Sequence, residues 1–214
     1  MAKKKQLIEN VNNNITRINF AFVGMYVFKD NSNAICIDTG VNVKDVEAGF
    51  KELNMDPKQV DAVLLTHSDR DHTGGVSLFT NANVYISADE EQMINGSTAR
   101  FFKFVRNKKP GCELNYLKDG DELKFGNISV KCISTPGHTP GSMSFLINGK
   151  YLFAGDILNL EKGAAVMDRG FLQMDRKLQE KSIRKLAKLH DIELLLTAHK
   201  GFTNNFEKAM VKWI

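Results

Sequence analysis

The sequence is poor in cysteine and has no long apolar run. Its three cysteines, Cys36, Cys112 and Cys132, are an odd number at wide and irregular spacings. They form neither a disulfide framework nor a C-x-x-C pair. The most apolar early run, INFAFVGMYVF at residues 18–28, is too short to span a bilayer as a helix. We therefore expect a reduced, cytoplasmic protein that does not cross a membrane.

Targeting signals, repeats and extreme charge are also missing. The start, MAKKKQLIEN, carries lysines, but no apolar segment follows them, so no secretory signal is expected. Low-complexity segments, solenoid repeats and linkers are absent, and residues 1–214 are expected to form a single domain. The formal net charge of +4 permits an anionic small-molecule substrate without requiring nucleic acid as a partner.

Apolar patterns predict that strands and helices alternate in each half of the chain. In the first half, β-rich runs cover residues 15–28 and 33–38, and a helical period follows at 43–53, then a buried strand at 61–66, a helix from about 73, a strand at 84–87 and a helix near 90. In the second half, strands are expected at 114–117, 122–125, 128–133, 142–147 and 151–154, then a helix at 175–190, a strand at 193–197 and a helix from about 204. This order predicts an α/β fold in which two mixed sheets pack face to face with helices outside.

Four of the five histidines lie in loops that follow predicted strands. His67 and His72 occur in THSDRDHTGG, His138 in STPGHTPGS and His199 in TAHKG, and Asp156 has the same setting in LFAGD. Loops at strand ends can aim side chains from distant parts of the chain into one cleft. Each of these residues taken singly is an ordinary loop residue, but their joint occurrence indicates a common site.

In this order, HSDRDH, STPGHTPGS, AGD and TAHKG resemble the pattern of the metallo-β-lactamase superfamily, which begins H-x-H-x-D-H. The resemblance covers roughly residues 15–205 and is specific because several spaced motifs match together. It implies a four-layer αββα sandwich with two divalent metal ions, zinc by family default, at the sheet edges. By position it assigns His67, Asp69 and His138 to the first metal, and Asp71, His72 and His199 to the second, with Asp156 bridging.

The chain departs from the family pattern at Asp69, where a histidine is usual. Four neutral imidazoles, three carboxylates and one hydroxide would neutralise two divalent ions, whereas a histidine at this position would leave one positive charge. A carboxylate is also a harder ligand than imidazole and moves the preference from zinc towards manganese or iron. We therefore expect a competent site with a broader metal preference; the alternative is a degenerate site.

The resemblance implies a metal-dependent hydrolase that cleaves an ester, thioester or phosphoester bond. In this mechanism Asp71 orients the nucleophile and Asp156 fixes the two metals. Two alternatives stay open because of Asp69. An H-x-D-x-D-H pattern is similar to that of the hydrolase domain of DNA-uptake proteins, which implies a phosphodiesterase acting on nucleic acid. A carboxylate at this position also occurs in flavodiiron oxidoreductases, although no flavin module is present here. A binding module that keeps the fold without catalysis is a third possibility.

Two segments are candidates for the walls of the site. Residues 100–109, RFFKFVRNKK, mix three phenylalanines with five basic residues. We favour a helix with an apolar underside and a solvated basic face over a wall that binds an anionic substrate. Residues 158–174 are expected to line the cleft because they follow Asp156 directly. Cys36 and Cys132 lie in predicted strands and are expected in the core.

Overall fold

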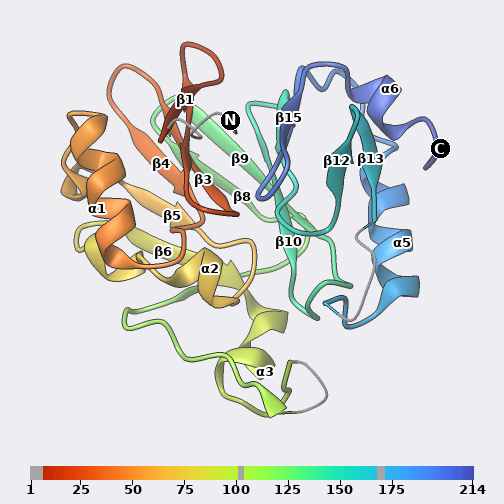
Figure 1. Cartoon of the computed structure of the whole chain (residues 1–214), viewed down its shortest axis with the longest axis horizontal. Coiled ribbons are helices and arrows are strands. Elements are labelled where there is room, and N and C mark those ends of the chain that lie inside the picture. The colour runs from red at the N-terminus through yellow and green to blue at the C-terminus, as the bar shows by residue number, and fades with distance from the viewer. Residues whose placement is uncertain (1–6, 101–103, 168–171) are drawn as a thin grey trace, which may run out of the picture.

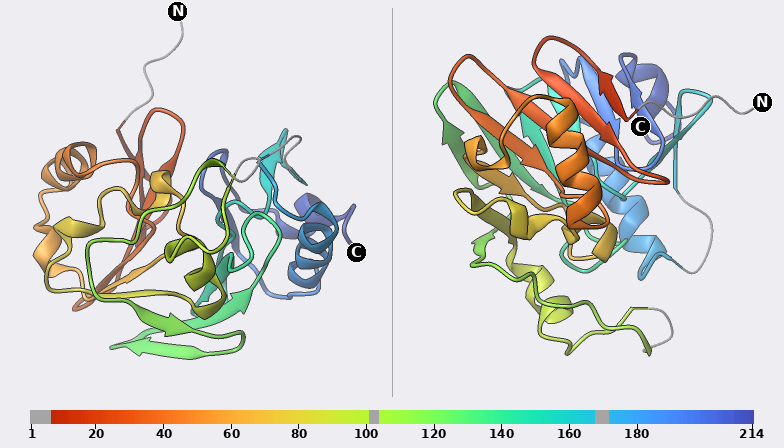
Figure 2. Two further views of the ribbon diagram at one scale, coloured as in Figure 1. Left: turned by 90° about the horizontal axis from the view of Figure 1, so that it is seen from below. Right: turned by 60° about the vertical axis from the view of Figure 1, so that its left-hand side comes forward.

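The computed structural model describes residues 7–100, 104–167 and 172–214. These residues form two large β-sheets that pack face to face, with helices on their outer sides (Figure 1 and Figure 2). The first sheet has seven strands in the order β1 (Ile8–Asn10), β2 (Ile15–Asn19), β3 (Gly24–Lys29), β4 (Ala34–Ile37), β5 (Ala62–Leu64), β6 (Asn83–Ser87) and β7 (Asn115–Leu117). The second has six in the order β15 (Gly201–Thr203), β14 (Leu194–Thr197), β11 (Tyr151–Phe153), β10 (Met143–Ile147), β9 (Ile128–Ser134) and β8 (Glu122–Phe125). A small ribbon pairs β12 (Asn159–Glu161) with β13 (Ala164–Val166).

Strands β4 to β7 of the first sheet run parallel to one another. The crossover from β4 to β5 contains helix α1 (Val43–Glu52), whose N-cap is Asn42; the side chain of this residue accepts a hydrogen bond from the backbone N–H of Asp45. Val46 and Phe50, one turn apart, are buried and pack on the sheet. Because parallel strands end at the same edge, the segments that follow β4, β5 and β6 meet there.

Strands β9, β11 and β14 of the second sheet also end at one edge. β10 pairs antiparallel with both β9 and β11, so these two run in the same direction, and β14 is parallel to β11. The β10–β11 hairpin turns at Asn148 and Gly149, whose φ angles of 52° and 68° are those of the expected tight turn. Three loops from this sheet therefore come together at its edge.

Three clusters of buried apolar side chains define four layers. One lies between the sheets and joins residues such as Phe28 of β3 to Phe145 of β10. A second lies between the first sheet and α1. The third lies between the second sheet and the helices α5 (Arg176–Leu186) and α6 (Phe206–Met210). The predicted αββα sandwich is confirmed, and Cys36 and Cys132 are fully buried in it as expected.

Several predicted elements differ from the structure. The helix expected from about Thr73 is instead the four-residue α2 (Arg70–Thr73), which ends at Gly74, where the backbone lies too close to the carbonyl of Val41 for any side chain. The helix expected at 175–190 ends at Leu186, and Leu178, which was placed on its apolar face, is 36% exposed. Other short helical segments of the described residues are α3 (Glu91–Ile94) and the 3₁₀ turns Pro57–Gln59, Val76–Leu78 and Ala88–Glu90.

The strands β1, β12, β13 and β15 were not expected from the sequence. Each has only three residues, which is too few to show a period of two. Across the described ranges, none of the helices has the length and apolar character that a bilayer crossing requires.

Candidate metal centre

The candidate ligands come from loops at one edge of both sheets. His67 to His72 follow β5, His138 follows β9, Asp156 follows β11 and His199 follows β14. Their donor atoms form three overlapping groups, in each of which they lie within 4.8 Å of one another. The groups are His67, Asp69 and His138; His67, His72 and Asp156; and Asp71, His72 and His199. The structure thus brings together all seven side chains singled out in the sequence.

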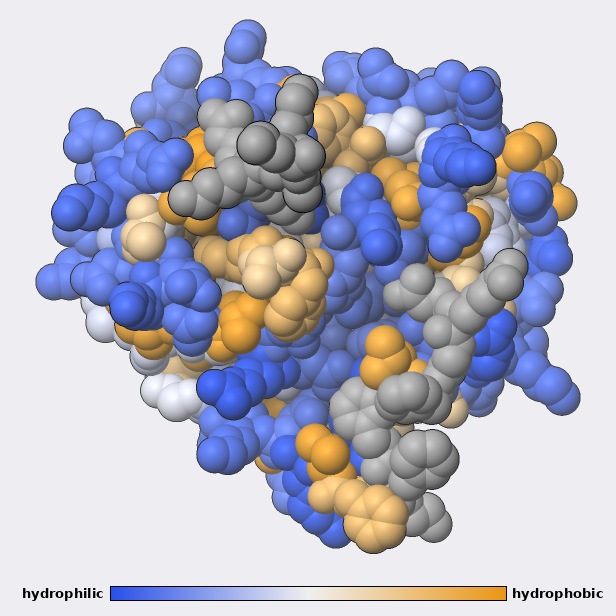
Figure 3. Space-filling model, viewed as in Figure 1, coloured by the Kyte–Doolittle hydropathy of each residue, from blue (hydrophilic) through white to orange (hydrophobic). Residues whose placement is uncertain are grey.

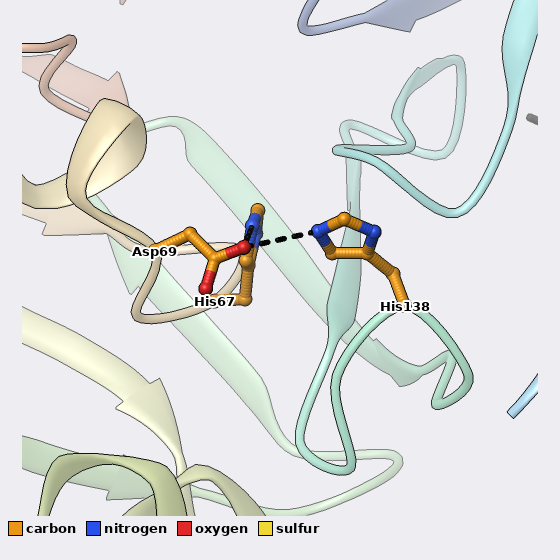
Figure 4. A group of neighbouring side chains, drawn as sticks. All are labelled: His67, Asp69 and His138. Carbon is orange, nitrogen blue, oxygen red and sulfur yellow. Dashed lines mark hydrogen bonds and ion pairs between the residues drawn. The ribbon is translucent and has the colours of Figure 1, made fainter. Parts of the chain in front are cut away.

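The first group spans the two sheets (Figure 4). Asp69 Oδ2 lies 3.5 Å from His67 Nε2 and 3.3 Å from His138 Nε2, and the dashed line in the figure marks the contact with His138. His67 is 1% exposed and His138 is 4% exposed. Three donor atoms face a common point, which is the arrangement that a small cation needs.

The second group faces the cleft, and Asp156 links it to the first. Asp71 Oδ2 lies 3.6 Å from His72 Nε2 and 3.7 Å from His199 Nε2. Asp156 Oδ2 lies 2.9 Å from His199 Nε2, 3.5 Å from His72 Nε2 and 3.6 Å from His138 Nε2. One oxygen of Asp156 is therefore near histidines of both groups, as a bridging carboxylate would be.

Each of the four histidines has a partner on Nδ1, the ring nitrogen away from the cluster. The partners are Thr66 Oγ1 for His67 at 3.0 Å, Asp38 Oδ2 for His72 at 2.7 Å, Gln173 Oε1 for His138 at 3.0 Å and the Phe22 carbonyl oxygen for His199 at 2.8 Å. A hydrogen bond from Nδ1–H to such an acceptor leaves the lone pair on Nε2, the tautomer that binds a metal.

The donor set fits a metal because buried polar atoms in it lack other partners. His67 Nε2, His72 Nε2 and Asp156 Oδ1 are buried and have no hydrogen-bond partner among the described residues. Buried polar atoms are normally satisfied, so unsatisfied atoms that converge on one point indicate a missing ligand. Imidazole nitrogens and carboxylate oxygens are suitable ligands for zinc, manganese and iron.

The buried carboxylates and imidazoles of the cluster shift one another's pKa values. Burial raises the pKa of Asp156, but the charge on His72 and hydrogen bonds with His199 and His72 outweigh it, and the pKa lies well below the usual range. Burial lowers the pKa of His72, but Asp156 and Asp38 raise it well above its usual value. Each carboxylate thus favours the protonated form of the imidazole beside it, and a divalent ion would compete with protons for the same donor atoms.

Asp38 is a supporting residue that sequence reasoning missed. It follows β4, is 2% exposed and has a positive φ of 60°. Besides its contact with His72, its carboxylate accepts hydrogen bonds from the backbone N–H and the hydroxyl of Thr66, at 2.8 and 2.9 Å. It thereby fixes both the start of the His67 loop and the orientation of His72. The signal was present, because Asp38, like Asp156, follows an apolar strand and lies within two residues of a glycine.

Glu90 is a second supporting residue that the sequence did not indicate. It is fully buried at the end of the Ala88–Glu90 turn. Its Oε1 accepts from the backbone N–H and hydroxyl of Ser68, at 2.9 and 2.7 Å, and its Oε2 accepts from the Thr139 hydroxyl and the Gly141 N–H, at 2.8 and 3.0 Å. One carboxylate thus ties the His67 loop to the His138 loop. In the sequence it is one of three consecutive acidic residues and looks like part of a solvated face.

Our preferred interpretation of residues 100–109 is wrong for the residues that the structure describes. Arg100, expected on a solvated basic face, is 2% exposed, whereas Phe104, expected on a buried underside, is 87% exposed. Arg100 Nη2 donates to Asp69 Oδ2 at 2.7 Å, and Asn107 Nδ2 donates to Asp69 Oδ1 at 2.9 Å. The charge balance drawn from the sequence changes as a result, because the guanidinium offsets the additional carboxylate. Residues 101–103 lie outside the described ranges.

A cleft of about 820 Å³ opens over both groups, since its lining includes Asp69 and His138 of the first and Asp71 and His199 of the second. Its apolar walls include Phe22, Val41 and Leu172, and its rim carries the exposed cations Arg70 and Lys200. The Phe22 ring stacks on His199 at 6.1 Å between centroids. Figure 3 shows hydrophilic surface in the middle of the face, between the halves that carry α1 and α5.

The expectation for residues 158–174 is confirmed for three of them. Asn159, Leu172 and Gln173 line the cleft. Residues 168–171 of the same segment lie outside the described ranges.

The comparison with known families agrees with the two-sheet fold and with the cluster of donor side chains at its edge. The chain belongs to the metallo-beta-lactamase superfamily, whose family model matches residues 19–199. Among solved structures, the Rm3 metallo-beta-lactamase superposes with a TM-score of 0.77 at 18% identity, over 98% of this chain and 90% of that chain. The SMB-1 metallo-beta-lactamase superposes with a TM-score of 0.75 at 19% identity, over 97% of this chain and 92% of that chain. At these identities the likeness shows the fold.

Curated relatives identify the chain as a hydrolase. It is 32% identical over 171 residues to a probable metallo-hydrolase of Methanocaldococcus jannaschii, which covers 78% of this chain and 71% of the relative. It is 27% identical over 185 residues to a hydroxyacylglutathione hydrolase of Aeromonas hydrophila, covering 86% of this chain and 64% of that protein. It is 30% identical over 151 residues to a probable polyketide biosynthesis zinc-dependent hydrolase of Bacillus velezensis, and the match covers 68% of this chain and 59% of that protein. The chain thus spans less than two thirds of the length of the last two.

Proposed function

We propose that the chain is a hydrolase that uses two divalent metal ions to cleave an ester or thioester bond. The observation that carries the proposal is the set of seven donor side chains in overlapping groups, with four histidines held by their Nδ1 atoms. In this proposal His67, Asp69 and His138 hold one ion, and Asp71, His72 and His199 hold the other. Asp156 lies between the two groups and contacts both.

Bound divalent ions would supply a water of lowered pKa and would polarise the bond to be cleaved. The side chains of the protein would position this water and the bond to be cleaved. Asp71, which is partly exposed and lines the cleft, can accept a hydrogen bond from the attacking water and take its proton. Asp156 is 10% exposed, and its contacts with His199 and His72 keep its carboxylate ionised and in place.

The cleft favours a substrate with an acyl part and an anionic part. Phe22, Val41 and Leu172 offer apolar contacts, while Arg70 and Lys200 offer positive charge at the rim. Hydroxyacylglutathione, the substrate in the name of one relative, is an anionic thioester, which fits this combination. A thioester is therefore the substrate class that we place first, ahead of a phosphodiester of nucleic acid.

Zinc is the metal that the name of the Bacillus velezensis relative supports. Asp69 keeps manganese and iron as candidates, because its carboxylate oxygen replaces an imidazole nitrogen. Since Arg100 offsets the charge of Asp69, the hardness of the oxygen, rather than the total charge, is the property that would shift the preference.

A substrate panel on reconstituted protein tests the proposed function. Protein loaded with zinc, manganese or iron is assayed with acyl thioesters, phosphomonoesters, phosphodiesters and lactams. We expect kcat/KM for an anionic thioester to exceed that for the other classes by about tenfold or more, the smaller end of what matched pocket contacts supply. Preferential cleavage of phosphodiesters would contradict the substrate class. Absence of hydrolysis together with an iron absorption band that bleaches on reduction would favour the diiron oxidoreductase.

A further inference from the structure

Arg100 places a buried positive charge against the first group of donors. Its Nη2 lies 2.7 Å from Asp69 Oδ2 and 3.1 Å from His138 Nε2, so it is within hydrogen-bonding distance of two of the three donor atoms. The oxygen that it contacts is the one that also faces His67 and His138. The guanidinium is fixed there, since its Nη1 donates to the carbonyl oxygens of His138 and Leu172, both at 2.9 Å.

The orientation of Asp69 does not depend on Arg100 alone. Asn107 Nδ2 donates to the other oxygen, Oδ1, at 2.9 Å, and to the Ser68 hydroxyl at 2.7 Å. A neutral amide therefore orients the carboxylate from one side, while a cation contacts it from the other. The effects of position and of charge can be separated by changing one residue at a time.

A fixed cation beside a metal-binding group has two consequences. It takes up one lone pair of Asp69 Oδ2, and it repels a divalent ion across a short distance in a poorly solvated place. Among the residues that the structure describes, no arginine or lysine forms an ion pair with Asp71, His72 or His199; the donor atoms of this second group lie near one another and near Asp156. The rim cation Arg70 is exposed, so solvent screens its charge.

We propose that Arg100 makes the two metal-binding groups unequal, so that the group of Asp71, His72 and His199 fills first and the group of His67, Asp69 and His138 fills second and more weakly. This inference rests on the proposed two-metal function and adds an order of filling to it. Arg100 and Asp69 together carry no net charge and stand in place of the usual histidine. Unlike a histidine, this pair places a positive charge, the guanidinium of Arg100, next to the donor atoms of the first group.

Titration of metal-free protein with zinc, against a chromophoric chelator, tests this inference without measuring catalysis. The wild-type protein should bind two ions with dissociation constants that differ by about 30-fold or more, and Arg100→Gln should narrow that difference by about tenfold or more, mainly by tightening the second step. Arg100→Lys, which keeps the charge, should preserve the difference to within about threefold, and Arg70→Gln, which removes a screened charge from the same cleft, should preserve it as well.

Asn107→Ala separates charge from positioning. It loosens Asp69 without changing any charge and should weaken the second step, the opposite of the result expected for Arg100→Gln. If both variants weaken the second step, Arg100 only positions Asp69 and the inference is wrong.

Asp69→Asn tests the order of filling even if Arg100→Gln does not fold. It should remove the weak step and leave the tight step unchanged; loss of the tight step would overturn the inference. If wild-type and Arg100→Gln proteins both stop at one ion in excess zinc, the two-metal function fails and the inference with it. Two ions bound with no change in Arg100→Gln would contradict the inference alone.

Discussion

Replacing Asp156 with asparagine is expected to remove bound metal and hydrolytic activity together. Its Oδ2 lies within 3.6 Å of Nε2 atoms from both groups, and Oδ1 is buried without a partner among the described residues. Asparagine keeps the shape but lacks the negative charge that two divalent ions require between them. We expect kcat/KM to fall by on the order of 10³ or more, and less than about a tenth of the metal to remain after dialysis.

The control for this variant is Asp191→Asn. Asp191 is exposed, lies outside the cleft and has a φ of 60°, which asparagine tolerates. Metal content is measured by mass spectrometry of the dialysed protein, and activity with the substrate found in the panel. An Asp156→Asn protein that keeps full metal occupancy and turnover, as Asp191→Asn should, would show that Asp156 is not a ligand.

Replacing Glu90 with glutamine is expected to lower the free energy of unfolding by about 2–4 kcal/mol. Hydrogen bonds to a charged group contribute about 1.5–3 kcal/mol each, and one of the two oxygens, which accepts two of them, becomes an amide that cannot accept. The donors that lose this acceptor belong either to Ser68 or to Thr139 and Gly141, all of which are buried. This effect is large for a substitution that adds no volume.

The matched control is the next residue, Glu91, which is exposed at the first position of α3. Glu91→Gln should change the unfolding free energy by no more than about 0.5 kcal/mol. Urea unfolding is followed in the presence of a chelator, so that lost metal binding does not add to the effect. Equal unfolding midpoints for Glu90→Gln and wild type would contradict the role of Glu90 as the tie between the two ligand loops.

The layers were predictable from local patterns, and the resemblance to the metallo-β-lactamase pattern indicated which side chains would gather at the candidate metal centre. Apolar runs such as residues 61–66 end in a loop that carries polar side chains, and strands of one sheet deliver such loops to one edge. His67, His138 and His199 therefore appear together in the structure as the motif spacing indicated. The candidate ligands occur in spaced motifs whose order can be read directly from the sequence.

The supporting residues were harder to predict because their partners are distant in sequence. Arg100 contacts Asp69 across 31 positions, and Glu90 contacts Gly141 across 51 positions. Nothing in the sequence of residues 100–109 distinguishes the buried Arg100 from the exposed Arg106, Lys108 and Lys109, since burial of an arginine is decided by tertiary contacts with a carboxylate and carbonyl oxygens. Phe104 is the converse case: it is an apolar residue, but it is exposed, and the sequence alone did not indicate this either.

Anomalous diffraction from crystals grown with zinc or manganese tests the two-metal centre most directly. Data collected on either side of the metal absorption edge should show two peaks at the common edge of the sheets. One peak should lie among His67, Asp69 and His138, and the other among Asp71, His72 and His199, with Asp156 between them. A single peak at full metal saturation, or peaks away from these side chains, would contradict the account.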